Sequence, residues 1–553
     1  MMRIHATPAG TDSPRAHHFR SMHDSYRHSF MEHALKAPPG RRPWVRRLGL
    51  LGLAALFAGC ATPDPALAPG ARDANDTGHG AAISQISRVP ALTPVSYAAH
   101  PTSIQALPGE LQRRWASTGI PESALSLVIA EVGRPPIVAI NPEEPRNPAS
   151  VMKLVTTYAA LHALGPAYTW QTGFFAGPGA TVSNGRLSTP LYVKASGDPT
   201  LTTEDVSAVF RRLRARGIRV LPGIVVDRSA FGPIGIDPGA FDERPDRVYN
   251  ASPDALLISS GALQVHYFPT LNGRAWEMAV EPRMSGVRVQ SQLRASQGTC
   301  SGRPAVKTQV TRQSGTVVLQ VSGTVPSSCG AFSLQRLVLP PAEHAARVLR
   351  SLWEDLGGQL TGPVTDGAVP DGAVLLASQE SAPLATVVRQ INKESDNLVA
   401  RMLLLALARA NGAEPVTPEQ ARAALQTALA RAGFKFPELV VENGAGLSRQ
   451  ARISAASLAA LLNQAWQSPR MPEFVSSLSI AGEDGTLRRR MRDGVARGAA
   501  HLKTGTLRDV SAVAGYVTGT SGKRYVVVAL VNHAQAHAAR DFMDEVVAWT
   551  AGR

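Results

Sequence analysis

Cysteine is scarce in this sequence: 553 residues contain three, and none stands in a Cys-x-x-Cys spacing. At about 100–200 residues per domain the length predicts two to four domains with a substantial core, not a small scaffold stapled by disulfides. Cys60 ends an apolar segment near the start, which leaves Cys300 and Cys329 as one possible pair. In an exported chain we expect this pair to form a disulfide, the alternative being two buried thiols.

Aromatic side chains are also few, at 5%, and no basic run interleaved with aromatics follows the first fifty residues. The sequence therefore lacks the pattern of basic and aromatic residues that is typical of nucleic-acid-binding proteins. The net charge of +15 is inflated by the start of the chain, because residues 1–59 hold nine Lys/Arg and three Asp/Glu, leaving 48 − 39 = +9 for the rest. That smaller surplus suits an anionic polymer such as cell wall. Hydrophobic residues at 44% and charged residues at 18% indicate a soluble globular protein.

No metal or cofactor is expected either. His533 and His537 are the one tempting histidine pair, and without a third ligand nearby they are more simply explained as a solvated helix face.

Long apolar runs are lacking as well. The apolar segment 48–59 has twelve residues, whereas a helix that spans a bilayer needs about 20. It follows four arginines, the layout of an export signal. Its end, Leu56-Phe57-Ala58-Gly59-Cys60, resembles the lipobox of bacterial lipoproteins, in which Cys60 would become the lipidated first residue and membrane anchor. An ordinary cleaved signal is the alternative, and both predict export. Ala61 after a lipidated cysteine would favour the outer membrane, and Met31 is a second possible start.

The remaining chain divides by composition and periodicity. Residues 60–107 are rich in Ala and Pro and predict a flexible tether. Residues 108–175 and 376–553 predict one α+β domain whose antiparallel sheet, flanked by helices, is completed by both ends of the chain. Residues 176–375 predict a large, strand-rich inserted module.

Within these parts, apolar spacing predicts individual elements. Helices are expected over 108–117, 151–164, 342–356, 383–410 and 538–549. Strands are expected over 124–132, 137–140, 305–310, 316–321, 511–517 and 525–531.

Three short motifs follow one another in order: Ser150-Val151-Met152-Lys153, Ser395-Asp396-Asn397 and Lys503-Thr504-Gly505-Thr506. Each occurs by chance in many chains. Together they match the SxxK, SDN and KTG set of penicillin-binding proteins and class A β-lactamases.

The chemistry of the motifs is consistent. On a helix Lys153 lies on the same face as Ser150, and a neutral lysine amine can take the serine proton. Burial and a second cation, Lys503, favour that neutral state. Ser395 would then pass a proton to the leaving amine, and Asn397 would hold the substrate amide.

The third motif would bind the substrate's charge. Thr504 and Thr506, with Gly505 between them, would bind a terminal carboxylate beside Lys503. The backbone N–H groups of Ser150 and Thr506 would form an oxyanion hole. The alternative is that these residues have only structural roles: Ser150 as a helix N-cap, Lys153 as a solvated helix residue and the Lys503 segment as an edge strand.

Over about residues 108–550 the sequence resembles the type-4 penicillin-binding proteins, the D-Ala-D-Ala carboxypeptidase/endopeptidase family. The resemblance extends to segments 195–201, 443–449 and 482–487, and to the long insertion that places Ser395 242 positions after Lys153. β-Lactamases resemble a single compact domain with an ExxLN segment, which is not found between Ser395 and Lys503.

The resemblance implies a serine peptidase that acts on peptidoglycan stem peptides and cross-links through a Ser150 acyl-enzyme, and that penicillins inhibit covalently. In the family an acidic residue of the inserted region binds the amino end of a diamino acid, and Asp246 is the best match. Asp198 is expected to be a turn residue, and Gly444, Gly446 and Arg449 to shape a loop beside the site. A β-lactamase and a weakly catalytic wall-binding lipoprotein remain as alternatives.

Overall fold

The computed structural model describes residues 97, 103–302 and 304–553. The expected export signal and Cys60 lie outside the described residues. Within the described part, no helix has the length and apolarity needed to cross a membrane.

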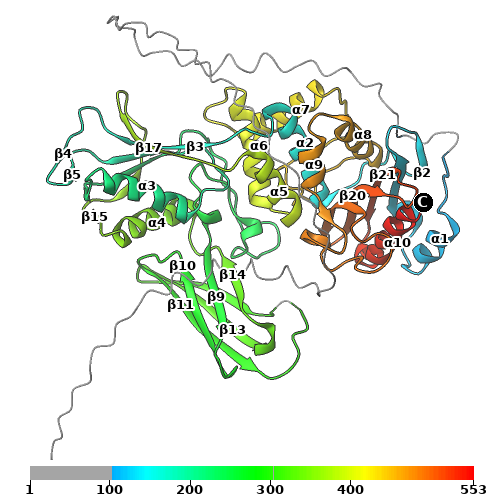
Figure 1. Ribbon diagram of the computed structural model, residues 1–553, viewed down its shortest axis with the longest axis horizontal. Helices are drawn as coiled ribbons and strands as arrows, with labels where there is room; N and C mark the ends of the chain where they lie inside the picture. Colours follow the sequence, from blue (N-terminus) through cyan, green and yellow to red (C-terminus); the bar gives the residue numbers. More distant parts are fainter. Residues whose placement is uncertain (1–96, 98–102, 303) are drawn as a thin grey trace, which may run out of the picture. The chain divides into compact units, whose positions relative to one another are not determined.

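A six-stranded antiparallel sheet forms the centre of the domain that carries the three motifs (Figure 1). Its strands, in spatial order, are β18 (Ser479–Ile480), β19 (Ala500–Leu507), β20 (Val510–Thr518), β21 (Arg524–Asn532), β1 (Leu125–Glu131) and β2 (Pro136–Ile140). Strands from the two ends of the chain lie side by side, because β1 pairs with β21 along seven residues. The expected α+β fold is confirmed.

Alternating side chains of the sheet enter two separate cores. Val526, Val528 and Leu530 of β21 belong to the core that includes α2 (Met152–Leu164) and α8 (Ala455–Gln467). Val527, Ala529 and Val531 point to the opposite face, where α1 (Gly109–Ala116) and α10 (Arg540–Ala551) pack against each other. This period of two is the pattern of a strand buried on both faces, and it yields a sheet between two helical layers.

The predicted tether ends earlier than residue 107. Ile104 pairs with β2, because its N–H donates to the Ile137 carbonyl (2.9 Å) and its carbonyl accepts from the Ala139 N–H (3.1 Å). Tyr97 is 2% exposed. Ile104 is therefore attached to the sheet, and Tyr97 belongs to the core that includes α2.

The single helix expected over 383–410 is in fact two, α5 (Leu384–Glu394) and α6 (Asn397–Ala410). Ser395 ends α5 in the left-handed conformation, at φ 59° and ψ 38°. The Asp396 side chain accepts a hydrogen bond from the Val399 N–H (3.0 Å) and caps α6. A cap offers the backbone an alternative to a continuous helix, which helical periodicity alone does not reveal. The remaining helices of this domain are α7 (Pro418–Arg431) and α9 (Met471–Ser476).

The inserted module begins and ends with paired strands. β3 (Gln171–Ala176) pairs with β17 (Val374–Glu380) in a five-stranded sheet that also contains β6 (Leu191–Lys194), β8 (Ile224–Asp227) and β16 (Val364–Asp366). The predicted boundaries at 176 and 375 fall inside this pair, so they are too narrow. Helices α3 (Thr203–Ala215) and α4 (Pro341–Asp355) pack together through Phe210 and Trp353 (ring centroids 5.3 Å). Of these two helices, α3 had not been expected.

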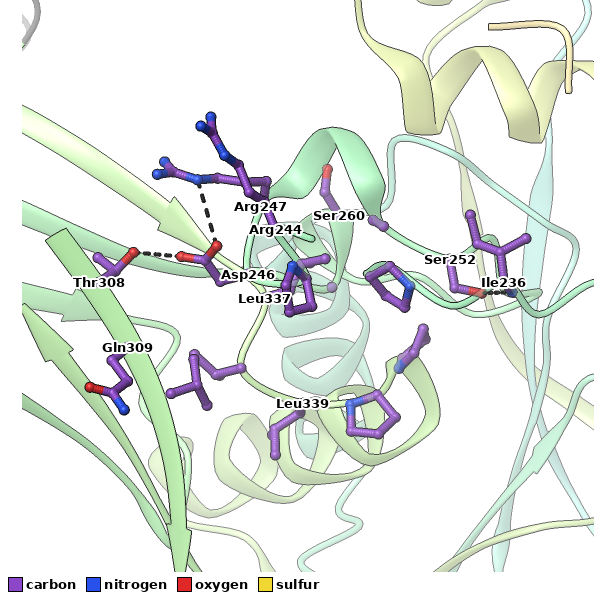
Figure 2. A pocket seen from close by; sticks show the side chains of 18 of the residues that line it. Ile236, Arg244, Asp246, Arg247, Ser252, Ser260, Thr308, Gln309, Leu337 and Leu339 are labelled. Atoms are coloured by element: carbon purple, nitrogen blue, oxygen red, sulfur yellow. Dashed lines mark hydrogen bonds and ion pairs between the residues drawn. The ribbon is translucent and has the colours of Figure 1, made fainter. Parts of the chain in front are cut away.

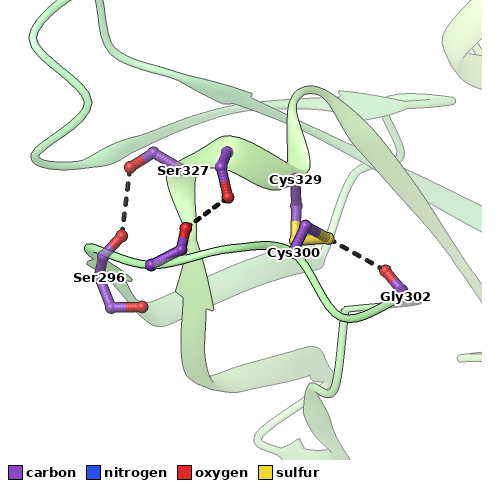
Figure 3. Close-up of a disulfide and its surroundings, with 7 residues drawn as sticks. Ser296, Cys300, Gly302, Ser327 and Cys329 are labelled. Carbon is purple, nitrogen blue, oxygen red and sulfur yellow. Dashed lines mark hydrogen bonds between the residues drawn. A yellow bond between two sulfur atoms is a disulfide. The ribbon is translucent and has the colours of Figure 1, made fainter.

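Smaller sheets complete the module. One contains β15 (Gln359–Leu360), β7 (Val220–Leu221), β5 (Arg186–Leu187) and β4 (Val182–Ser183). A second contains β10 (Trp276–Glu281), β9 (Leu263–Pro269) and β14 (Phe332–Arg336), and a third contains β11 (Val287–Ser296), β13 (Thr316–Pro326) and β12 (Lys307–Gln313). The strands expected over 305–310 and 316–321 are present as β12 and β13, which pair as a hairpin joined at Ser314-Gly315, where both φ angles are positive. A disulfide joins Cys300 to Cys329 (Figure 3).

Candidate active site

Ser150 lies in a short 3-10 turn, η3 (Ala149–Val151), immediately before α2. Ala149 has a φ of 46°, in the left-handed region that residues with a Cβ seldom adopt. Such a conformation costs on the order of 1–3 kcal/mol and persists only where its surroundings hold it. Ser150 itself is partly exposed.

Two glycines approach this turn closely. A Cβ on Gly446 would lie 1.8 Å from the Ala149 carbonyl oxygen, and Gly446 also has a φ of 74°. A Cβ on Gly505, in the third motif, would lie 2.5 Å from the Pro148 carbonyl oxygen. The turn therefore contacts both the 443–448 segment and β19 at distances that only glycine permits.

The Lys153 amine is fully buried and has three oxygen neighbours. Its Nζ lies 2.6 Å from Asn397 Oδ1, 2.6 Å from the Ala445 carbonyl oxygen and 3.1 Å from Ser150 Oγ. The first two oxygens can only accept hydrogen bonds. A neutral amine has two N–H groups and one lone pair, so it can donate to both and turn its lone pair toward the Ser150 hydroxyl.

The electrostatics of the site favour that neutral form. Burial lowers the pKa of Lys153 well below its usual value, and the positive charge of Lys503 lowers it further. Burial also lowers the pKa of Lys503, to about 7. The expectation that burial and a second cation would act on Lys153 agrees with this direction.

Lys503 contacts the second motif. Its Nζ donates to Ser395 Oγ (2.9 Å) and to the Thr504 carbonyl (2.8 Å). The left-handed residue between α5 and α6 is thus the one whose hydroxyl contacts the second lysine. Thr504 Oγ1 donates a hydrogen bond to Thr486 Oγ1 (2.9 Å). Within the described residues, β18 pairs only with His501 and Leu502 of β19. In this part of the chain, the same edge of β19 therefore has no neighbouring strand beyond Lys503. Thr506 is exposed there.

Asn397 connects the site to the inserted module. Its Nδ2 donates to the Tyr249 carbonyl (3.3 Å), and Arg401, one turn further along α6, donates to the Ala251 carbonyl (2.8 Å). These contacts and that of Ala445 were missed from the sequence. They involve backbone carbonyls, which any residue supplies, so no side-chain pattern marks them.

Asp246, the residue matched to the family's acidic position, is paired with neighbours inside the inserted module. It accepts a hydrogen bond from Thr308 and forms ion pairs with Arg336 (3.1 Å) and Arg247 (3.6 Å), as Figure 2 shows for two of these contacts. It lines a cavity of 990 Å³ that none of the motif residues lines. Its carboxylate is satisfied inside the module, which explains its presence without a substrate.

Another acidic residue of the same segment, Asp242, is connected to Asn397 through Tyr249. Asp242 accepts hydrogen bonds from the Tyr249 hydroxyl (2.8 Å) and from Asn250 Nδ2 (2.7 Å), and the Tyr249 carbonyl is the one that Asn397 contacts.

Two further expectations concern residues beside the motifs. Asp198 Oδ1 accepts from the Thr200 N–H and hydroxyl (both 2.8 Å), which is the turn expected for it. Arg449 lies over the Phe241 ring at 4.9 Å and donates to the Phe241 carbonyl, so it contacts the loop of the inserted module. Among the described residues, no group of three or more His, Cys, Asp or Glu could hold a metal ion.

The profile of the D-Ala-D-Ala carboxypeptidase 3 (S13) family matches residues 109–553. The D-alanyl-D-alanine carboxypeptidase of Actinomadura sp. (strain R39) is 31% identical over 394 residues, covering 68% of this chain and 71% of that protein. The D-alanyl-D-alanine carboxypeptidase DacB of Haemophilus influenzae is 24% identical over 393 residues, covering 69% and 80%. The crystal structure of penicillin binding protein 4 from H. influenzae matches with a TM-score of 0.63 and 23% identity, covering 79% of this chain and 98% of that one.

The close approach of Gly446 gives a prediction for stability. In Gly446→Ala the new methyl collides with a backbone oxygen, which no side-chain rotation relieves. Gly433→Ala is the matched control, because Gly433 has a φ of 87° and no atom within 4 Å of the new Cβ. We expect thermal unfolding to show Gly446→Ala less stable than Gly433→Ala by about 1–3 kcal/mol. Equal losses would mean that only the backbone angle matters.

Proposed function

The chain belongs to the D-Ala-D-Ala carboxypeptidase 3 (S13) family of serine-type hydrolases, and on this premise we propose that it cleaves D-Ala-D-Ala ends and D-alanyl cross-links of peptidoglycan stem peptides through an acyl-enzyme on Ser150. The observation that carries the proposal is the set of three oxygens around Lys153 Nζ. Two of them occupy its N–H groups and leave Ser150 Oγ, at 3.1 Å, facing the lone pair.

In the proposed acylation, neutral Lys153 takes the Ser150 proton while Oγ attacks the carbonyl carbon of the penultimate D-alanine. The backbone N–H groups of Ser150 and Thr506 stabilise the oxyanion, a contribution of about 3–4 kcal/mol per donor. As the tetrahedral intermediate collapses, the C–N bond breaks and the leaving amine receives a proton through Ser395. Water then hydrolyses the ester and restores Ser150.

The third motif supplies the binding side of the mechanism. Charged Lys503, with Thr504 and Thr506, pairs with the terminal carboxylate of the substrate, and such charge-assisted hydrogen bonds are about twice as strong as neutral ones. This state lowers the Lys153 pKa as well, so the residue that binds the carboxylate also favours the base. Asn397, whose Oδ1 accepts from Lys153, holds the substrate amide.

For the amino end of a diamino acid in the stem peptide, Asp242 has the stronger support. Its neighbour Tyr249 contacts Asn397, whereas Asp246 is paired with two arginines. The specificity of the enzyme for the stem peptide would then depend on a loop of the inserted module.

The central experiment is an intact-mass time course with excess benzylpenicillin, followed by removal of the drug. We expect one adduct on the Ser150 peptide of the wild-type protein, and we expect it to persist, because no ExxLN segment supplies a base for deacylation. Ser150→Ala should form no adduct. Lys153→Ala should be acylated orders of magnitude more slowly, with its fold intact, because the proton acceptor is lost.

Other outcomes would assign other functions. An adduct in Ser150→Ala, or normal acylation in Lys153→Ala, would refute the roles given to these residues. Rapid drug consumption with the mass returning to its starting value would identify a β-lactamase. Neither adduct nor consumption would favour a wall-binding protein.

The pH dependence tests the two lysines together. The reaction needs Lys153 neutral and Lys503 charged, and kcat/KM reports the pKa values of the free enzyme. Because the pKa of Lys503 is lowered to about 7, kcat/KM on a synthetic D-Ala-D-Ala peptide should fall as the pH rises above this value and Lys503 loses its proton. In Lys503→Arg the cation does not titrate in this range, so the alkaline limb should move above pH 10. An unmoved limb would assign it to another group.

Export and lipid anchoring at Cys60 complete the proposal. The support is the four arginines, the apolar segment and the lipobox-like end in the sequence. Metabolic labelling with palmitate should mark the wild-type protein and leave Cys60→Ala unlabelled. An unlabelled, water-soluble mature wild-type protein would indicate an ordinary cleaved signal.

A further inference from the structure

Asn147, three residues before Ser150, has both ends of its side-chain amide engaged. Its Oδ1 accepts from the N–H of Ala149 (2.9 Å), the residue with the strained φ, and its Nδ2 donates to the Ser448 carbonyl (2.8 Å). Asn147 is 6% exposed, so these bonds are made away from water. The side chain therefore links the nucleophile turn to the 443–448 segment, whose Ala445 carbonyl contacts Lys153.

Asn532, the last residue of β21, holds the backbone of the same residue. Its Oδ1 accepts from the Asn147 N–H (2.8 Å), and its Nδ2 donates to the Asn147 carbonyl (3.0 Å). A side-chain amide offers one acceptor and one donor side by side, so it makes the pair of bonds that a neighbouring strand would make. The turn is thereby attached to the central sheet.

Arg146 fixes the segment one residue earlier. Its guanidinium donates to Ser126 Oγ and to the Ser123 carbonyl (both 2.6 Å), and its backbone exchanges two hydrogen bonds with Ile453. The chain is thus anchored up to Asn147, and the strained residue follows at Ala149. The contacts of Asn147 and Asn532 are the last side-chain anchors before Ser150.

We propose that Asn147 and Asn532 are positioning residues for acylation: they hold the Ala149 turn so that Ser150 Oγ stays within hydrogen-bonding distance of Lys153 Nζ. The inference rests on the proposed function, in which Ser150 is the nucleophile and Lys153 its base. Neither asparagine contacts the reacting atoms. Both are uncharged, so their loss should change the position of the hydroxyl without changing the charge around Lys153.

The size of the effect follows from geometry. A displacement of about 1 Å at a reacting group can cost on the order of 100-fold in rate. Loss of one anchor leaves Gly446 and Gly505 still packed against the turn, so a partial displacement is expected. We therefore expect Asn532→Ala and Asn147→Ala to slow acylation by about 10- to 100-fold.

The test measures single-turnover acylation by benzylpenicillin in the full chain, as rate at saturation, final acylated fraction and pH dependence. Both alanine variants should reach complete acylation, at the reduced rate, with the pH midpoint of the wild-type protein. Asn463→Ala is the matched control, because Asn463 is also buried (5% exposed) and bonds at long range to the Gly133 N–H (2.7 Å).

A purely structural role would change different quantities. It would lower the final acylated fraction, through unfolded protein, and leave the rate of the folded fraction unchanged, as expected for Asn463→Ala. A lower acylated fraction with an unchanged rate would overturn the inference. So would a wild-type rate in both alanine variants, or a shifted pH midpoint. An adduct in Ser150→Ala would instead refute the proposed function.

Discussion

The site depends on the burial of two lysine amines, those of Lys153 and Lys503, whose charges act on each other. Lys153 and Lys503 are both 0% exposed, and a buried charge without partners is costly. The Asn397 and Ala445 oxygens accept hydrogen bonds from Lys153. Those of Ser395 and Thr504 accept from Lys503, and none of these four oxygens belongs to a carboxylate. The cheapest state of Lys153 in this setting is the neutral one, which is also the state that can take a proton from a serine.

The fold meets this constraint with local departures from regular structure. A left-handed Ser395 interrupts a helical sequence and contacts Lys503, and a strained Ala149 precedes the partly exposed Ser150. Gly446 and Gly505 let two other segments approach the Ala149 turn so closely that a Cβ at either position would collide with a backbone oxygen. Ser395 and Gly505 belong to motifs and Ala149 precedes one, whereas Gly446 lies in the 443–448 segment, whose Ala445 carbonyl contacts Lys153.

The inserted module contributes to the site through its backbone. The Tyr249 and Ala251 carbonyls accept from Asn397 and Arg401, one helical turn apart on α6. The Asp246 side chain, by contrast, pairs with Arg336 and Arg247 of the same module. A module whose backbone contacts Asn397 can position that side chain without supplying a group that reacts, which agrees with the principle that loops on a rigid scaffold carry function.

The sequence by itself determined the α+β class, the sheet shared by both chain ends, most elements and the three motifs, because periodicity and residue type are local properties. It also singled out Cys300 and Cys329, which the structure joins. Only the tertiary structure decided that the helix over 383–410 breaks at Ser395, that Ile104 belongs to the sheet, and that Asp246 pairs with Arg336. It also revealed Ala445 and the Asn147–Asn532 contacts. Their partners lie hundreds of positions apart and include backbone atoms, and neither feature leaves a pattern along the chain.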